Sequence, residues 1–89
     1  MTFDDARRAV EVALAGAWRS GRLATAADGY EDAESYLVAY GDARYIEGGD
    51  IAYMTLDAPA AFVSKETGAV ALVPYLDAAG RIDGMKPTA

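Results

Sequence analysis

The first twenty residues place apolar side chains at the spacing of an α-helix. Apolar residues recur every three or four positions and would share one helix face: Phe3, Ala6, Val10, Ala13, Leu14, Ala17 and Trp18. Thr2, with Asp5 three positions later, resembles a capping box that begins the helix. Ser20-Gly21 would end it, because glycine readily adopts the left-handed conformation that follows a helix. Trp18 is expected to cover one end of the core.

A pattern typical of a β-strand begins at Ser35. The stretch Ser35–Tyr40 is rich in aromatic and branched residues. Tyr36, Val38 and Tyr40 would share one face of this strand, and the two residues between them would share the other. Because neither face is polar, two interpretations stay open. Either the strand is central and covered on both faces, or its tyrosines point outwards as a binding surface.

The clearest sheet signal is a hairpin whose arms are Ala60–Ser64 and Ala69–Val73. The turn between them ends in Gly68, where a type I turn with a bulge needs a residue at positive φ. A shorter strand is predicted at Ile51–Leu56, ahead of Pro59, because proline cannot donate to a sheet ladder. These segments predict an antiparallel sheet.

The remaining segments carry weaker signals. Arg22–Glu34 has no assignable pattern beyond the turn signal Asp28-Gly29. Pro74 would end the second hairpin arm or place it at a sheet edge. Beyond it, Asp77 would cap a short helical turn with two apolar contacts, Ile82 and Met85.

The length and these elements predict one α+β domain spanning residues 1–89. A chain of 89 residues is too short for two independent cores. We expect an N-terminal amphipathic helix packed on a small antiparallel sheet of three to four strands, followed by a short C-terminal helical turn. The hydrophobic content of 53% is enough for a folded core.

The negative charge is concentrated in the middle of the chain. The net charge is −6, yet residues 28–57 hold eight acids and one base, and the rest of the chain is close to neutral. Because phosphate contacts need clustered lysine and arginine, this distribution argues against binding nucleic acid. Two interpretations remain: the acids attract a basic protein partner, or they only keep the domain soluble.

The residue types needed for common chemistries are missing. The chain has no cysteine and no histidine, which excludes thiol nucleophiles, thiolate metal sites and the usual general base. The acids between Asp28 and Glu34 do not have the spacing of an EF-hand loop. Ser64 and Lys65 would face opposite sides of a strand, so the lysine would not activate the serine. We therefore expect a protein that is not an enzyme, with no cofactor and no bound metal.

The N-terminus and the apolar runs indicate where in the cell the protein is expected to act. The first five residues contain two acids, where a signal peptide would carry basic residues. No apolar run approaches the roughly 20 residues that span a membrane. With no cysteine for disulfides, we expect a cytoplasmic protein without membrane contact.

Residues 51–73 carry a resemblance to a known family. A segment that contains tyrosine is followed by Pro59, an apolar strand, a Lys-x-Thr-Gly turn and a second strand, here Phe62–Val70. This order resembles the immunity protein 35 family of polymorphic toxin systems. The resemblance implies a helix packed on a small antiparallel sheet, and a protein that neutralises a cognate toxin by binding it.

The sequence thus predicts a small acidic protein-binding domain, an immunity or inhibitor protein. The predicted contacts are acids and tyrosines of the middle segment: Glu31, Asp32, Glu34, Tyr36, Tyr40, Asp42, Glu47 and Asp50. The alternative is a self-associating, non-catalytic accessory or structural protein of phage or bacterial origin, with a homodimer as its simplest form. This alternative depends on the apolar strand at Ser35–Tyr40 and on Pro74, which would place a strand near a sheet edge.

Overall fold

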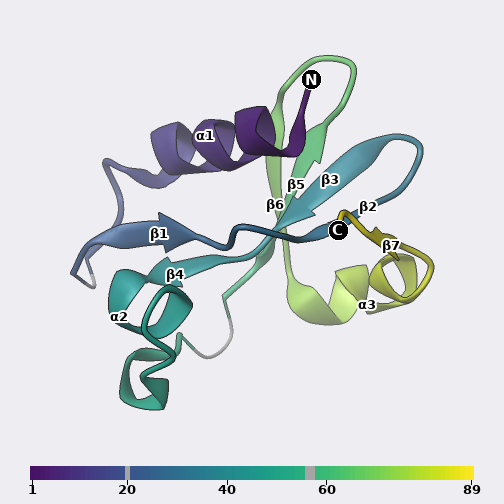
Figure 1. Ribbon diagram of the computed structural model, residues 1–89. Helices are drawn as coiled ribbons and strands as arrows, with labels where there is room; N and C mark the ends of the chain where they lie inside the picture. The colour runs from purple at the N-terminus through teal and green to yellow at the C-terminus, as the bar shows by residue number, and fades with distance from the viewer. Residues whose placement is uncertain (20, 56–57) are drawn as a thin grey trace.

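In the computed structural model, two helices cover opposite faces of a five-stranded antiparallel sheet (Figure 1). The structure describes residues 1–19, 21–55 and 58–89. The order of elements is α1 (Phe3–Leu14), β1 (Leu23–Thr25), β2 (Tyr30–Glu31), β3 (Ser35–Val38), β4 (Tyr40–Asp42), α2 (Ala43–Ile46), η1 (Ile51–Tyr53), β5 (Ala60–Ser64), β6 (Val70–Val73), α3 (Tyr75–Asp83) and β7 (Lys86–Pro87). The larger sheet has the strand order β6-β5-β3-β2-β7, and β1 pairs with β4 in a separate two-stranded sheet. The α+β class predicted from the sequence is therefore confirmed, with more strands than expected.

Helix α1 begins as predicted and ends earlier. The capping box is present: the Thr2 hydroxyl accepts from the Asp5 N–H, and the Asp5 carboxylate accepts from the Thr2 N–H. The regular helix stops at Leu14, whose carbonyl accepts from the Ala17 N–H in a tighter turn. Gly16 in this turn weakens the helix. Of the predicted end, Ser20 lies outside the described residues.

The sheet has a core on each face. Under α1, five fully buried residues form one cluster: Ala6, Val10, Val38, Ala61 and Val63. On the opposite face, Phe62 packs against Ala78 of α3 and against Met85. Strand β3 lies between β5 and β2, which explains why the Ser35–Val38 segment is apolar on both sides.

The expected strand Ser35–Tyr40 is in fact two strands. It breaks at Ala39, whose carbonyl accepts from the Ala26 N–H at 2.9 Å. Strand β3 stays in the larger sheet, and β4 crosses to pair with β1. Tyr36 and Tyr40 therefore lie on different strands, although both pack with Val38 in the cluster under α1, so the shared face expected from the sequence is confirmed.

The predicted hairpin is confirmed, and the prediction of a shorter strand that begins at Ile51 is wrong. Strands β5 and β6 pair through a turn in which Gly68 has a φ of 76°. Residues Ile51–Tyr53, expected as a strand, form a 3₁₀ turn, because the Asp50 side chain accepts from the Ala52 N–H and stabilises a local turn. Leu56, the expected end of that strand, lies outside the described residues.

The C-terminal helical turn is a nine-residue helix that begins before Asp77. The Pro74 carbonyl accepts from the Asp77 and Ala78 N–H groups, so α3 follows the end of β6 directly. The expected apolar contacts are confirmed, because Met85 is buried and Ile82 packs against the same cluster. Within the described part of the chain, no helix is long and apolar enough to cross a membrane.

Candidate functional site

Folding pairs much of the acidic segment with bases from elsewhere in the chain. Three of the acids proposed as contacts form ion pairs across the fold: Glu31 with Lys65 at 2.7 Å, Asp32 with Arg81 at 2.9 Å, and Glu47 with Arg22. All three bases lie outside residues 28–57. The charge asymmetry of the sequence is therefore weaker on the folded surface than along the chain.

Asp42 has a structural role. Its side chain is fully buried, caps α2 by accepting from the Arg44 N–H, and holds the Arg44 guanidinium at 2.7 and 2.9 Å. These bonds satisfy a carboxylate that is costly to bury unpaired. A buried side chain offers no surface to a partner, which removes Asp42 from the candidate contacts. Glu34 and Asp50 remain exposed.

Asp32 links the β2–β3 turn to α3. Its carboxylate accepts from the Glu34 and Ser35 N–H groups at 2.9 and 2.8 Å and from the Arg81 guanidinium at 2.9 Å. The Arg81 hydrogen bond, helped by these backbone bonds, lowers the pKa of Asp32 from 3.8 to about 2.

This lowered pKa predicts a loss of stability in acid. Because the folded pKa of Asp32 lies below its unfolded value, its contribution is complete above about pH 4 and is lost as the pH falls to about 2. Discounted for solvent screening, that contribution is about 1 kcal/mol. Asp32→Asn should flatten the slope of unfolding free energy against pH between these values, measured by urea denaturation. Glu66→Gln, which removes a charge from an exposed turn, should leave the slope unchanged, and an equal flattening there would contradict the assignment.

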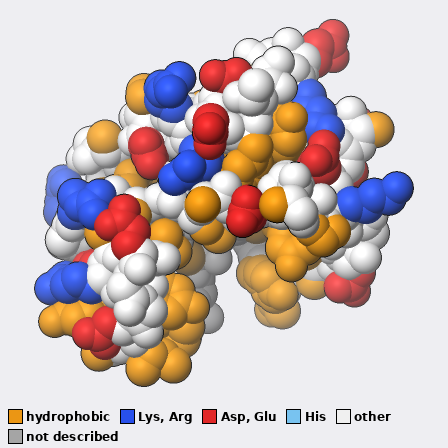
Figure 2. Space-filling model, viewed as in Figure 1, with side chains coloured by type: hydrophobic (Ala, Val, Ile, Leu, Met, Phe, Trp, Pro, Cys, Tyr) orange, Lys and Arg blue, Asp and Glu red, His pale blue; other side chains and the backbone are white. Residues whose placement is uncertain are grey.

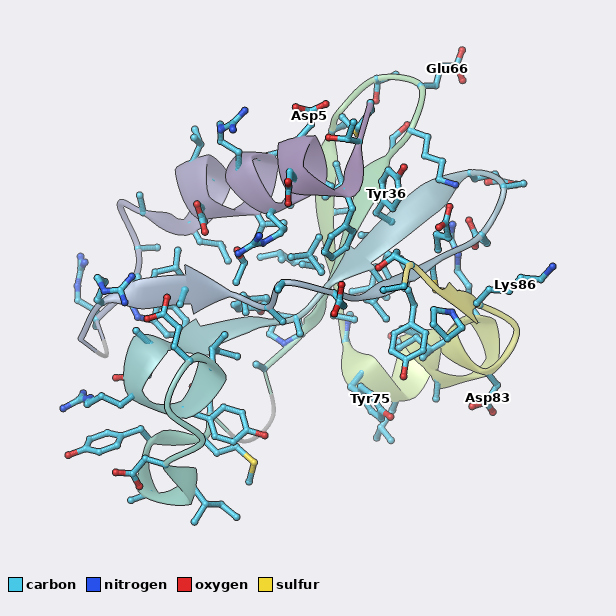
Figure 3. The ribbon with its side chains drawn as sticks, viewed as in Figure 1. Asp5, Tyr36, Glu66, Tyr75, Asp83 and Lys86 are labelled. Carbon is cyan, nitrogen blue, oxygen red and sulfur yellow. The ribbon has the colours of Figure 1, made fainter. Side chains whose placement is uncertain are left out.

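Tyr36 packs under the start of α1. Its ring meets Phe3 edge-on at a centroid distance of 5.7 Å, and the Lys65 ammonium lies 4.7 Å from the ring centroid. Its hydroxyl donates to the Met1 carbonyl at 3.3 Å. Figure 3 shows Tyr36 on the α1 side of the sheet, while Tyr75 lies by α3. Tyr36 is therefore half-buried, and most of its ring packs against neighbouring residues and does not form a free surface.

Tyr40 is held from two sides. Its hydroxyl donates to the Pro59 carbonyl at 2.7 Å, and Trp18 meets its ring edge-on at 6.1 Å. Burial raises the pKa of Tyr40. Trp18 packs at the edge of the core, as expected from the sequence. Tyr40 also lines a groove that the sequence did not reveal.

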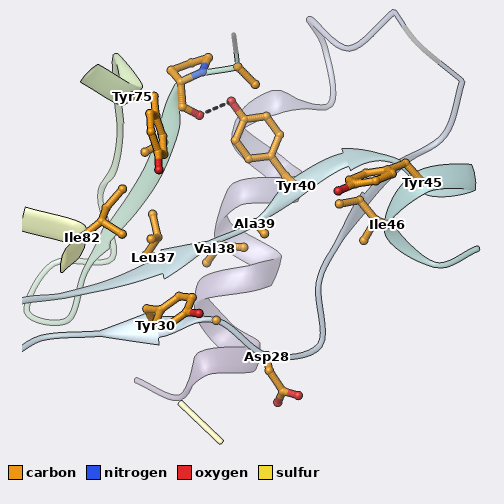
Figure 4. A pocket seen from close by; sticks show the side chains of 14 residues that line it. Asp28, Tyr30, Leu37, Val38, Ala39, Tyr40, Tyr45, Ile46, Tyr75 and Ile82 are labelled. Carbon is orange, nitrogen blue, oxygen red and sulfur yellow. Dashed lines mark hydrogen bonds between the residues drawn. The ribbon is translucent and has the colours of Figure 1, made fainter. Parts of the chain in front are cut away.

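This tyrosine groove lies between α3 and α2 and has a volume of about 290 Å³. Tyr30, Leu37 and Tyr75 line one side, and Tyr45 and Ile46 line the other (Figure 4). The molecular surface is hollowed between the ends that carry α2 and α3, and hydrophobic side chains gather on both sides of this hollow (Figure 2). Tyr30 is 45% exposed and Tyr75 is 58% exposed, so their rings are open to a ligand.

The groove is apolar along its length. Among the described residues that line it, Asp28 is the one charged side chain, and it is exposed. The described part of the chain also contains no cluster of three acids placed to hold a metal ion. The arrangement can bind an apolar group next to a cation.

Sequence reasoning missed three of the four tyrosines of the groove. Tyr30 falls in the segment without an assignable pattern, Tyr45 in a short helix, and Tyr75 at the start of α3. One signal was available: the chain has six tyrosines and only two phenylalanines, an aromatic composition that suits a partly exposed surface. No family model, curated protein or solved structure matches the chain.

Proposed function

We propose that this protein is a binding domain that inhibits a basic protein partner by taking an apolar side chain of that partner into the tyrosine groove. The observation that carries the proposal is the groove itself, which combines an apolar floor with exposed tyrosine rings. Tyrosine supplies a large apolar face and a hydroxyl, and it is enriched at the energetic centres of protein interfaces.

The shape of the site favours a protein ligand over a small molecule. The groove is open, and two of the tyrosine rings that line it, those of Tyr30 and Tyr75, are exposed. Exposed apolar patches of this kind mark interaction surfaces in soluble proteins. An anchor side chain in the groove, with surrounding contacts on the rim, fits the usual anatomy of an interface.

The charge of the protein favours a basic partner. The net charge is −6, and Asp28 places a carboxylate at the groove. A lysine or arginine beside the partner's anchor residue would meet Asp28, while the overall negative field would speed encounter. The acidic segment thus contributes through its exposed acids, Asp28 among them, and less through the acids that are already paired.

Inhibition is supported by the resemblance of residues 51–73 to the immunity protein 35 family. A domain without its own chemistry neutralises a toxin by occupying the surface that the toxin needs. The hairpin that carries the resemblance, Ala60–Ser64 with Val70–Val73, supplies Ala60 to the groove and Phe62 to the core beneath it.

Truncating two exposed tyrosines should weaken binding strongly. The double variant Tyr30→Ala with Tyr75→Ala removes both exposed rings, and we expect at least about a tenfold loss of affinity for the partner. Leu76→Ala is the matched control, because it truncates an exposed apolar residue of the same helix outside the groove. The partner is first isolated by co-purification with the tagged wild-type protein from the native host, and affinities are then measured by calorimetry.

Binding through the groove and inhibition of the partner can each be disproved without the other. If the double variant binds the isolated partner as tightly as the wild type, the groove is not the binding site. If the partner binds through the groove but is equally toxic with and without this protein in a growth assay, inhibition is wrong and binding stands. Asp28→Asn tests the charge: it should weaken binding and reduce its dependence on salt concentration.

A further inference from the structure

The two edges of the larger sheet are built differently. At one edge lies β7, which consists of Lys86 and Pro87. Lysine and proline both prevent further pairing at a sheet edge. At the other edge lies β6, Val70–Val73, and no charged residue occurs between Ala69 and Tyr75. The β6 edge therefore lacks both protecting residue types within its strand.

The backbone groups at this edge have a defined orientation. The Ser64 N–H donates to the Ala69 carbonyl at 2.9 Å, which makes these two residues a hydrogen-bonded pair. Such pairs alternate along an antiparallel ladder. In the register of β5 and β6, Ala71 then bonds to β5, while the N–H and C=O groups of Val70 and Leu72 point away from the sheet.

The side chains of the same two residues extend an apolar surface to the edge. Val70 and Leu72 pair with Val63 and Ala61, which belong to the cluster under α1, so they lie on the α1 face. Leu72 is 45% exposed, and Val12 of α1 is 74% exposed. Val70 and Val12 line a shallow groove between the helix and the strand.

We propose that β6 pairs with β6 of a second copy of this chain, forming an antiparallel dimer about a two-fold axis at Ala71. In this register Val70 lies opposite Leu72 of the second copy, so the outward N–H and C=O groups bond reciprocally in both directions. The two copies of Ala71 meet on the axis, where a small side chain allows close approach. The edge is thus complementary to itself.

The pairing edge itself carries no charge. The chain has a net charge of −6, so most faces of two copies repel each other. Ala69–Tyr75 are seven consecutive uncharged residues, and the groove beside Val70 is lined by one acid and one base, Asp5 and Arg8, whose charges balance. Leu72 of the second copy would cover Val70 at the mouth of the groove beside Val12, and its own exposed surface would be buried.

The test compares two leucine substitutions of equal charge. Sedimentation equilibrium of the wild type should show a monomer–dimer equilibrium, and Leu72→Lys should raise the dissociation constant at least about tenfold by placing a charge in the pairing edge. Leu76→Lys, at another exposed leucine, should dimerise as the wild type does. Thermal melts check that both variants are folded. Hydrogen exchange should show the Val70 and Leu72 amides becoming protected as the dimer forms.

Three results would overturn the dimer. They are a wild-type protein that stays monomeric at every concentration, a Leu72→Lys variant that dimerises normally, and a dimer whose Val70 and Leu72 amides exchange as fast as in the monomer. The β6 edge and the tyrosine groove share no lining residue. Loss of dimerisation in Leu72→Lys therefore leaves the proposed function untouched, and a failed groove test leaves the dimer untouched.

Discussion

Phe62→Ala should lower the free energy of unfolding by about 3–5 kcal/mol. Phe62 lies in the middle of β5, is 4% exposed, and packs against Ala78 and Met85 under α3. The Arg81 guanidinium lies 4.6 Å from its ring centroid. Truncation removes the largest side chain of this cluster and leaves a cavity that a regular sheet cannot close. A domain of this length has a total stability of about 4–13 kcal/mol, so the variant would be close to unfolding.

The measurement is urea denaturation of the wild type and the variant, followed by far-ultraviolet circular dichroism. Phe62→Leu is the control, since it keeps an apolar side chain of intermediate volume and should cost less than about 1.5 kcal/mol. A Phe62→Ala variant within about 1 kcal/mol of the wild type, the ordinary cost of a point mutation, would show that the α3 face contributes little to stability.

The elements that depend on neighbouring residues are those that the sequence predicts well. The capping box needs only Thr2 and Asp5, and the hairpin needs Gly68 between two apolar arms. Both signals lie within a few residues of the structure that they specify. Phe62 also lies on the predicted hairpin. Its partner Ala78 belongs to a helix that begins earlier than the sequence predicts, because Pro74 follows the end of β6 and is also the N-cap of α3.

The elements that depend on distant residues escape sequence reasoning. Strand β2 has two residues, and it exists because it pairs with β3 on one side and β7 on the other. Strand β1 has three residues and likewise depends on pairing with a strand distant in the sequence, β4. Strands of two or three residues carry too little pattern to be distinguished from loops. Ala39 marks the break between β3 and β4 only because Ala26 reaches its carbonyl.

The candidate site also combines features that the sequence predicts with features that depend on contacts between distant residues. The sequence identified the charge of the middle segment, but not that Lys65, Arg81 and Arg22 would pair with its acids. Tyr40, one of the contacts predicted from the sequence, lines the groove, but the sequence did not indicate that a groove exists there. The groove arises where β2, β4, α2 and α3 converge, and no local pattern records that convergence.

Gly29→Ala should be strongly destabilising, by about 3 kcal/mol, the upper end of the usual cost of overpacking. A Cβ at this position would lie 2.3 Å from the Leu37 carbonyl oxygen and 2.7 Å from Cζ of Phe3. The carbonyl belongs to β3 and cannot move without disturbing the centre of the sheet. Gly29 also exchanges hydrogen bonds with Thr88: its N–H donates to the Thr88 hydroxyl, and its carbonyl accepts from the Thr88 N–H.

Gly80→Ala is the matched control. Gly80 lies within α3, is exposed, and a Cβ there would meet nothing within 4 Å. In a helix interior this change should raise the free energy of unfolding by about 0.5–1 kcal/mol. The two variants carry the same methyl group and should move the thermal midpoint in opposite directions. Two small shifts of the same sign would mean that the connection from β1 to β2 does not pass as close to β3 as the packing of Gly29 requires. In that case the Tyr30 wall of the tyrosine groove, which follows Gly29 directly, would be placed differently as well.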